Sequence, residues 1–233
     1  MFPGPRSLNS PVLGVPVALF RLAIQAKEAY QHPQQYDEVA LARLRREIEV
    51  WEGIVLSNGR IDTLVDGHSP STQQIYYEGA SYLYVLIISL LLEQIEQNSW
   101  CHGPQIPPHN QLPNAVPRDA WQIRKALFIL QQFESDDDWC NCYIGNWSVY
   151  TLGFFLSDPK DIALVRNEMK RRWESTKFIQ AARFHEDLEK AWEQRSHGAA
   201  GSSVSTSNEI WDLLNGPDTM SEWDFTACVP NDG

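Results

Sequence analysis

Glu78 is the residue whose sequence neighbours best suit acid–base chemistry. It follows Tyr76 and Tyr77, and it stands just before Tyr82 and a stretch made almost entirely of apolar residues. Partial burial at such a place would raise the pKa of the carboxyl group, so that it could exchange a proton with a bound ligand. The alternative is that Glu78 has no catalytic or ligand-binding role.

A second group of residues is aromatic and would suit the binding of an apolar molecule. Six aromatic residues between Trp139 and Phe155 lie close enough in the sequence to line a cavity. Aromatic residues at helical spacing also form ordinary hydrophobic core, which is the competing interpretation. The candidate ligand-binding residues are Tyr77, Glu78, Trp139, Tyr143, Trp147 and Tyr150.

Common catalytic and metal-binding motifs are absent from the sequence. It contains no Gly-x-Ser-x-Gly, no His-Glu-x-x-His and no glycine-rich phosphate loop. Structural zinc is usually held by two ligand pairs with roughly two to four residues inside each pair, and neither Cys140-x-Cys142 nor Cys101-His102 has that spacing. We therefore expect no metal and no other cofactor, and we name no catalytic residue.

The balance of charge argues against direct binding to nucleic acid. Lys and Arg total 19 against 30 Asp and Glu, which gives a formal net charge of -11. Affinity for a phosphate backbone comes mainly from Lys and Arg, so we expect no direct contact between this chain and DNA.

The sequence indicates an intracellular protein without a membrane span. No charged and apolar regions of a secretory signal open the chain, and only four cysteines occur. The longest apolar run, Ala80 to Leu92, is thirteen residues long, below the roughly 20 needed to cross a bilayer. We expect it to form the middle of a buried helix.

Apolar residues recur at helical spacing along most of the chain and must position the candidate side chains. Asp37 and Asp158 can each cap a helix, Pro159 suits a first helical position, and Asp119 is a further expected start. Residues 134–138 are expected to form an acidic loop. We expect helices at about 16–31, 37–56, 71–98, 119–133, 158–174 and 178–195.

The same spacing predicts which faces are buried. In the first helix, Val17, Phe20, Ile24, Ala26 and Ala29 are expected to face inward. In the helix that begins at Asp158, the face with Val165 and Met169 packs inward, and four basic residues form its solvated remainder: Arg166, Lys170, Arg171 and Arg172.

These elements predict an all-α fold. We expect a single domain over residues 10–195, with about seven to eight helices and a central apolar helix. Residues 196–233 are expected to form a flexible linker and an acidic tail, in which Glu209–Leu214 and Glu222–Phe225 mix acidic and bulky apolar residues. Such a tail can be an activation segment, a short helix that docks on the domain, or a segment without a role.

The stretch from Asn146 to Arg195 resembles the C-terminal regulatory region of fungal-specific transcription factors of the zinc-cluster family. The resemblance rests on a Trp-led apolar segment, the Asp158-Pro159 helix start and a final Leu188-x-x-x-Trp192-x-x-Arg195 pattern. Three further segments look like earlier parts of that region and occur in the same order, so that the resemblance covers most of residues 10–195: Pro11–Leu22, Leu44–Glu52 and Tyr76–Tyr84.

The resemblance implies a nuclear, effector-responsive domain in the regulation of transcription, with a role in secondary metabolism. In that family an N-terminal cluster of six cysteines binds DNA, and this sequence lacks it. The implied partners are a small hydrophobic metabolite, a second copy of the chain or an intact transcription factor. Two alternatives remain open: a helical enzyme that isomerises or cyclises a hydrophobic secondary metabolite, and a protein-interaction module that needs no ligand.

Overall fold

The predicted all-α class is confirmed. A computed structural model describes residues 15–57, 72–102, 113–141 and 145–198, and these contain eight α-helices, one short 3-10 helix and no strand. The elements are α1 (Val17–Gln31), η1 (Pro33–Gln35), α2 (Glu38–Leu56), α3 (Thr72–His102), α4 (Trp121–Gln132), α5 (Asp137–Cys140), α6 (Gly145–Gly153), α7 (Pro159–Thr176) and α8 (Ile179–Gly198). The predicted tail lies outside the described residues from position 199 onward.

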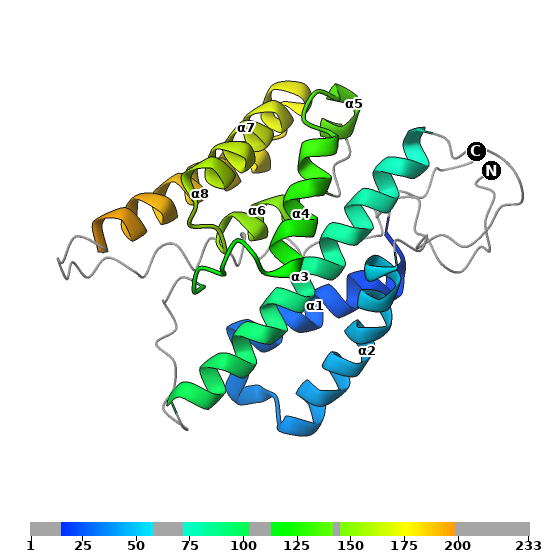
Figure 1. The fold of residues 1–233 in the computed structure, drawn as a ribbon, viewed down its shortest axis with the longest axis vertical. Coiled ribbons are helices and arrows are strands. Elements are labelled where there is room, and N and C mark those ends of the chain that lie inside the picture. The colour runs from blue at the N-terminus through cyan, green and yellow to red at the C-terminus, as the bar shows by residue number, and fades with distance from the viewer. Residues whose placement is uncertain (1–14, 58–71, 103–112, 142–144, 199–233) are drawn as a thin grey trace, which may run out of the picture.

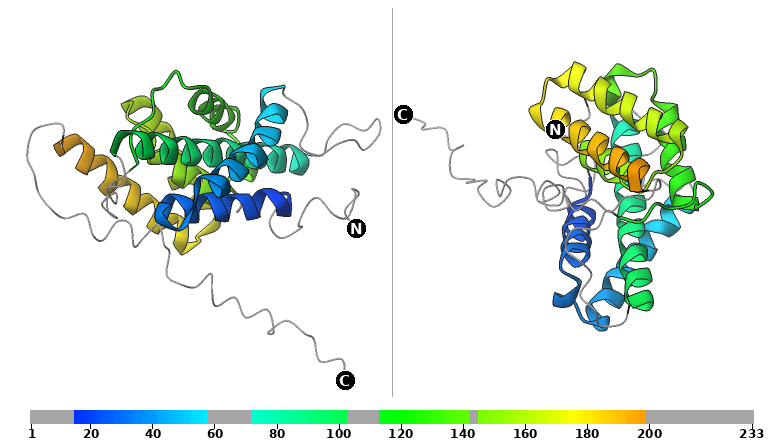
Figure 2. Two further views of the ribbon diagram at one scale, coloured as in Figure 1. Left: turned by 90° about the horizontal axis from the view of Figure 1, so that it is seen from below. Right: turned by 90° about the vertical axis from the view of Figure 1, so that its left-hand side faces the viewer.

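Helix α3 is the central helix, as the sequence predicts. Every residue from Leu83 to Leu92 is buried, because α1, α2, α4 and α6 each pack along part of its length (Figures 1 and 2). The stretch Ile75–Gln97 is long and apolar enough to cross a membrane, but 78% of its most apolar window is buried inside the fold. Buried core helices of soluble proteins can be equally long and apolar, so length and composition are weak evidence for a membrane span.

Two predicted caps are confirmed and one is wrong. Asp37 accepts a hydrogen bond from the Ala40 amide at 2.7 Å, and Asp158 accepts one from the Lys160 amide at 2.8 Å. Helix α4 starts two residues after Asp119, with Ala120 at its cap position and no side-chain bond there.

The predicted acidic loop over 134–138 is wrong in its second half. Asp136 accepts hydrogen bonds from the Asp138 and Trp139 amides, at 3.0 and 3.3 Å, and so caps the one-turn helix α5. A carboxylate can satisfy the free amides of a helix start even when the helix is a single turn.

The predicted inward face of α1 is confirmed for Ala26 and Ala29 and wrong for Ile24. Its buried residues are Leu19, Leu22, Ala23, Ala26 and Ala29, whereas Ile24 is 37% exposed. Helix α1 packs against α3 and α2, and small side chains such as these alanines let helix backbones approach closely.

Helices α7 and α8 form an antiparallel pair that covers α6 (Figure 1). Lys177 links them in a left-handed conformation with φ 53°, a conformation often found after the last residue of a helix. At the other end of the pair, the Trp192 indole N–H donates to the Gly153 carbonyl at 3.0 Å.

Gly153 of α6 lies in close contact with α8, and this contact generates a testable prediction. A Cβ atom at Gly153 would lie 2.6 Å from Cδ2 of the fully buried Leu188, whereas one at Gly53 of α2 meets nothing within 4 Å. Gly153→Ala should therefore lower the free energy of unfolding by about 1–3 kcal/mol. The matched control Gly53→Ala should raise it by about 0.5–1 kcal/mol, because Gly is a poor residue inside a helix.

Urea unfolding of the two variants, followed by circular dichroism, measures both changes. Equal effects of the two substitutions would contradict the close contact between α6 and α8.

Candidate functional site

The candidate ligand-binding residues are distributed over three environments. Trp139 belongs to α5 and is fully buried, Trp147 and Tyr150 belong to α6, and Tyr77 and Glu78 lie near the start of α3. Tyr143 lies outside the described residues.

Trp139, Trp147 and Tyr150 each pack against a different aromatic neighbour. Trp139 stacks on Phe133 with ring centroids 4.4 Å apart, and Trp147 lies 5.1 Å from Tyr84. Tyr150 stacks on Phe184 at 4.0 Å. Ring pairs of this kind are ordinary contacts of a hydrophobic core, which is the competing interpretation of these residues.

Glu78 has a local partner. Its Oε1 accepts a hydrogen bond from the Tyr82 hydroxyl one helical turn later, at 3.2 Å. Neither of the two hollows described below is lined by Tyr77 or Glu78.

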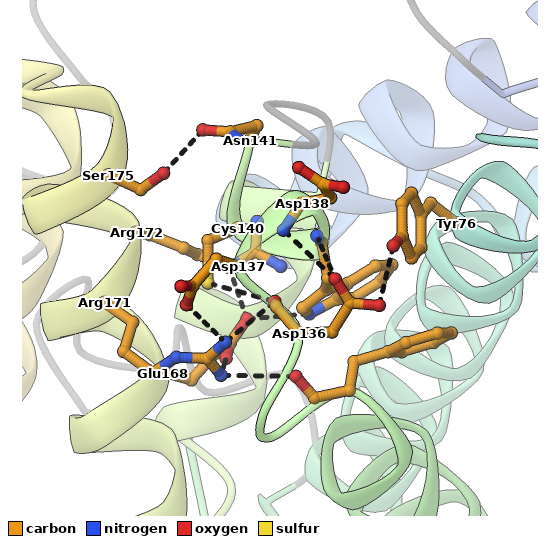
Figure 3. Close-up of polar contacts among 12 residues, drawn as sticks. Tyr76, Asp136, Asp137, Asp138, Cys140, Asn141, Glu168, Arg171, Arg172 and Ser175 are labelled. Carbon is orange, nitrogen blue, oxygen red and sulfur yellow. Dashed lines mark hydrogen bonds and ion pairs between the residues drawn. The ribbon is translucent and has the colours of Figure 1, made fainter. Parts of the chain in front are cut away.

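The strongest polar feature is a buried charge junction, defined by Trp139, Asn146, Glu168 and Arg172 (Figure 3 labels Glu168 and Arg172). Arg172 was expected to be solvated, and this prediction is wrong, because its side chain has no exposed area. Its Nε donates to Glu168 Oε1 at 2.7 Å, and its Nη1 donates to Asn146 Oδ1 at 2.9 Å. The same Glu168 oxygen accepts from the Trp139 indole at 2.8 Å.

The charge junction joins three helices that are separate in the sequence. Trp139 comes from α5, Asn146 from α6, and Glu168 and Arg172 from α7. A buried ion pair is tolerated when good geometry and further hydrogen bonds offset the loss of hydration, as they do here. Gly145 leaves room for the guanidinium, since a Cβ atom there would lie 3.0 Å from Nη2 of Arg172.

Arg171 fixes the chain between α4 and α5 from the outside. Its Nη1 donates to the Phe133 carbonyl at 3.2 Å and its Nη2 to the Asp136 carbonyl at 2.7 Å (Figure 3). The carboxylate of Asp136 also accepts a hydrogen bond of 2.6 Å from the Tyr76 hydroxyl of α3. Arg171 and Arg172 are neighbours on α7 but lie in different environments. Arg172 lies inside the core and Arg171 lies at its edge.

Beside α5 lies an open polar hollow of about 430 Å³. Its lining residues are Gln131, Gln132, Ser135, Asp136, Asp137 and Asp138. The described part of the chain contains no group of three His, Cys, Asp or Glu side chains that could hold a metal ion. The hollow therefore has acidic walls without a ligand set for a cation.

A second, apolar cavity lies at the seam between α1, α3 and α6, and we call it the seam cavity. It is lined by Lys27, Tyr30, Gln31, Leu91, Pro113, Trp147, Thr151 and Phe154. Its volume of about 20 Å³ leaves room for about one water molecule. Of the candidate residues, Trp147 borders it, and the sequence analysis did not single out its other walls on α1.

Two half-buried cations lie at the seam cavity or next to residues that line it. Arg195 of α8 donates to the carbonyls of Pro113, Leu156 and Phe154, and the first two bonds measure 2.6 and 2.9 Å. Burial lowers the pKa of Lys27, and burial raises the pKa of Tyr30 against the opposing effect of Arg195. No carboxylate of the described residues lies within ion-pair distance of Lys27.

Comparison of the chain with protein-family models, with curated protein sequences and with solved structures gives no match. The arguments about function therefore rest on the sequence and on the geometry described above.

The charge junction predicts a strongly non-additive pair of substitutions. Arg172→Met removes the fully buried partner of Glu168, which then keeps only Arg171 at 3.3 Å, so it should cost up to about 3–5 kcal/mol of stability. Arg172→Met combined with Glu168→Met should cost less than either single change, because no unpaired charge then remains inside. The control Lys170→Met removes an exposed cation and should change stability by less than about 0.5 kcal/mol.

Urea unfolding followed by tryptophan fluorescence measures all four variants, since Trp139 is part of the junction. Strict additivity of the two single substitutions would show that Arg172 and Glu168 do not depend on each other.

Asp187 of α8 predicts a dependence of stability on pH. Burial raises its pKa to about 6 from an ordinary 3.8, an effect that Glu186 reinforces and Lys190 opposes. Between these two values the folded protein keeps a proton that the unfolded chain has lost, so stability falls as pH rises from about 4 to 6 and is then constant.

Asp187→Asn should remove this decline and raise stability at pH 7 by roughly 1–3 kcal/mol, since one pKa unit corresponds to about 1.4 kcal/mol. The measurement is the free energy of unfolding in urea between pH 4 and 7, with Glu193→Gln, which changes an exposed acidic residue of the same helix, as control. A decline that persists in Asp187→Asn would assign it to another group.

Proposed function

We infer that residues 10–195 form the regulatory, effector-responsive domain of a fungal transcription factor that does not contact DNA itself. The observation that carries this proposal is the seam cavity with Trp147 on its wall. Helix α6, which supplies Trp147, lies inside the segment whose sequence resembles that family. The excess of acidic residues supports the absence of a direct contact with DNA.

The size of the seam cavity decides what kind of response is possible. Sites for small molecules usually have about 300–1,000 Å³, and the seam cavity has about 20 Å³. A hydrophobic metabolite therefore needs α1 to move away from α6 before it can enter. The domain then has a closed and an open packing, and an effector shifts their populations by its difference in affinity for the two.

A partner protein can act on the same equilibrium. The seam lies between α1 and the elements that follow α3, so a partner that binds one side and not the other favours one packing. A metabolite and a partner protein can therefore both act as effectors through this one seam.

Native mass spectrometry of the protein purified from its own host tests the proposal first. We expect a retained hydrophobic molecule of a few hundred daltons or a bound partner protein. A retained molecule should raise the melting temperature of the intact chain, because it binds the folded state alone.

Trp147→Ala should abolish that increase, whereas Trp121→Ala should preserve it. Trp121 is also half-buried, but it belongs to α4 and does not line the seam cavity. A protein that copurifies with neither a molecule nor a partner would overturn the proposal, and so would an effector whose stabilisation is unchanged by Trp147→Ala.

A further inference from the structure

The two most exposed large apolar side chains of the described residues both belong to α2. Val39 is 73% exposed and Val50 is 67% exposed, whereas the other exposed side chains of this kind lie between 37% and 57%. Val50 follows Val39 by about three helical turns, so both side chains lie on one face of the helix. Valine is a poor helix former, because its branched side chain is restricted in a helix. The two valines therefore suit packing against a further helix better than exposure to water.

The face with the two valines is turned away from the helices on which α2 packs. Leu44, Ile48 and Val55 are buried on the opposite face, against α1 and α3, and Figure 1 shows α2 at the edge of the fold. Ala42 and Gly53 are exposed near the valines, and a Cβ atom at Gly53 would meet nothing within 4 Å. Small residues of this kind let the backbone of another helix come close. We call this surface the α2 face, and it consists of Val39, Ala42, Val50 and Gly53.

Four exposed charged side chains border the α2 face and are complementary to a second copy of the same helix. Arg43 and Arg46 come before Glu47 and Glu49 along α2. A copy that runs in the opposite direction places the arginines of one helix against the glutamates of the other, whereas a parallel copy opposes like charges. Arg43 donates to Glu47 of its own helix at 2.9 Å, but exposed pairs of this kind are worth little. Little is therefore lost when these partners are exchanged between copies.

The charge of the whole chain favours the same surface. The formal net charge is -11, so two copies repel each other over most of their surface. The four charged residues that border the α2 face are two arginines and two glutamates, and they cancel. Repulsion between copies is therefore weak where the exposed valines lie.

We propose that the α2 face binds a second copy of this chain, with the two α2 helices antiparallel about a two-fold axis near Arg46 and Glu47. Val39 of each copy then lies beside Gly53 of the other. Interfaces smaller than about 1,200 Å² are usually transient, and a single pair of helices gives a weak, reversible dimer. This goes beyond the proposed function, because none of the residues that line the seam cavity belongs to α2.

Analytical ultracentrifugation of the intact chain tests the proposal between about 5 and 500 µM, in about 0.15 M salt to screen the overall repulsion. We expect a monomer at the lowest concentration and a dimer at the highest. Val50→Lys should raise the dissociation constant of the dimer at least about tenfold, because it places a cation in the apolar part of the interface. The control Phe128→Lys changes an exposed apolar residue of α4 and should leave the dissociation constant unchanged.

Charge reversal tests the antiparallel pairing. Arg43→Glu with Arg46→Glu gives an acidic variant, and Glu47→Arg with Glu49→Arg gives a basic variant. Each variant should be monomeric alone, and an equimolar mixture should dimerise, since opposite charges meet only in the mixed pair. Both chains keep an overall excess of acidic residues, so attraction in the mixture must come from α2. Circular dichroism and melting temperatures show whether the variants are folded.

Three results would overturn the inference. A chain that stays monomeric up to about 500 µM would exclude the dimer. A dimer that persists in Val50→Lys and in both charge variants would place the interface on another surface. Charge variants that stay monomeric when mixed would exclude the antiparallel pairing.

A monomeric chain leaves two other occupants of the α2 face that can be distinguished. A loss of stability in Val50→Lys would assign the face to a contact within the chain. A different protein that copurifies with the chain, but not with Val50→Lys, would assign the face to that protein. The effector experiments with Trp147→Ala do not involve α2, so the dimer can fail while the proposed function stands.

Discussion

The constraint on which the structure depends is the burial of α3. A helix that is apolar on nearly all sides must be covered on all sides, because any uncovered face would keep apolar surface in water. Four helices that are far apart in the sequence provide this cover, and α3 thereby fixes their positions relative to one another. The helices α7 and α8 are positioned in turn, since they pack on α4, α5 and α6.

Two arginines determine how α7 and α8 are placed against the rest of the fold. Apolar contacts between helices are tolerant of small shifts, whereas a buried charge is stable only where its partners meet it. Arg172 finds Glu168 and Asn146 inside the core, and Arg195 finds three backbone carbonyls near the end of α8. Both cations lie on the helix pair that covers α6, so they determine how this pair is placed against the rest.

The seam between α1 and α6 holds an apolar cavity that Trp147 borders. The aromatic rings pack against one another, and the seam cavity has room for about a water molecule. A response to an effector must therefore come from a change in helix packing. Lys27 makes the seam a natural place for such a change, because a cation among apolar side chains gains stability when an acidic group joins it.

The sequence by itself determined the fold class, the central helix and most helix boundaries. Those features follow from local rules: apolar spacing predicts α3, and the side chains of Asp37 and Asp158 cap helices through contacts within a few residues. Local rules failed at Ile24, Asp119 and the start of α5. At these positions the structure depends on which face another helix covers, or on whether a helix of a single turn is stable.

Tertiary structure alone decided which charged and aromatic residues are buried and which residues they contact. Arg172 belongs to a helix with a basic surface, and its spacing from Glu168 fits an ordinary exposed pair. Only the approach of α5 and α6 removes both from water. The seam cavity likewise combines residues of α1 and α6 that are more than a hundred positions apart in the sequence. Helical periodicity states which residues share a face, but it contains no information on which distant face will cover them.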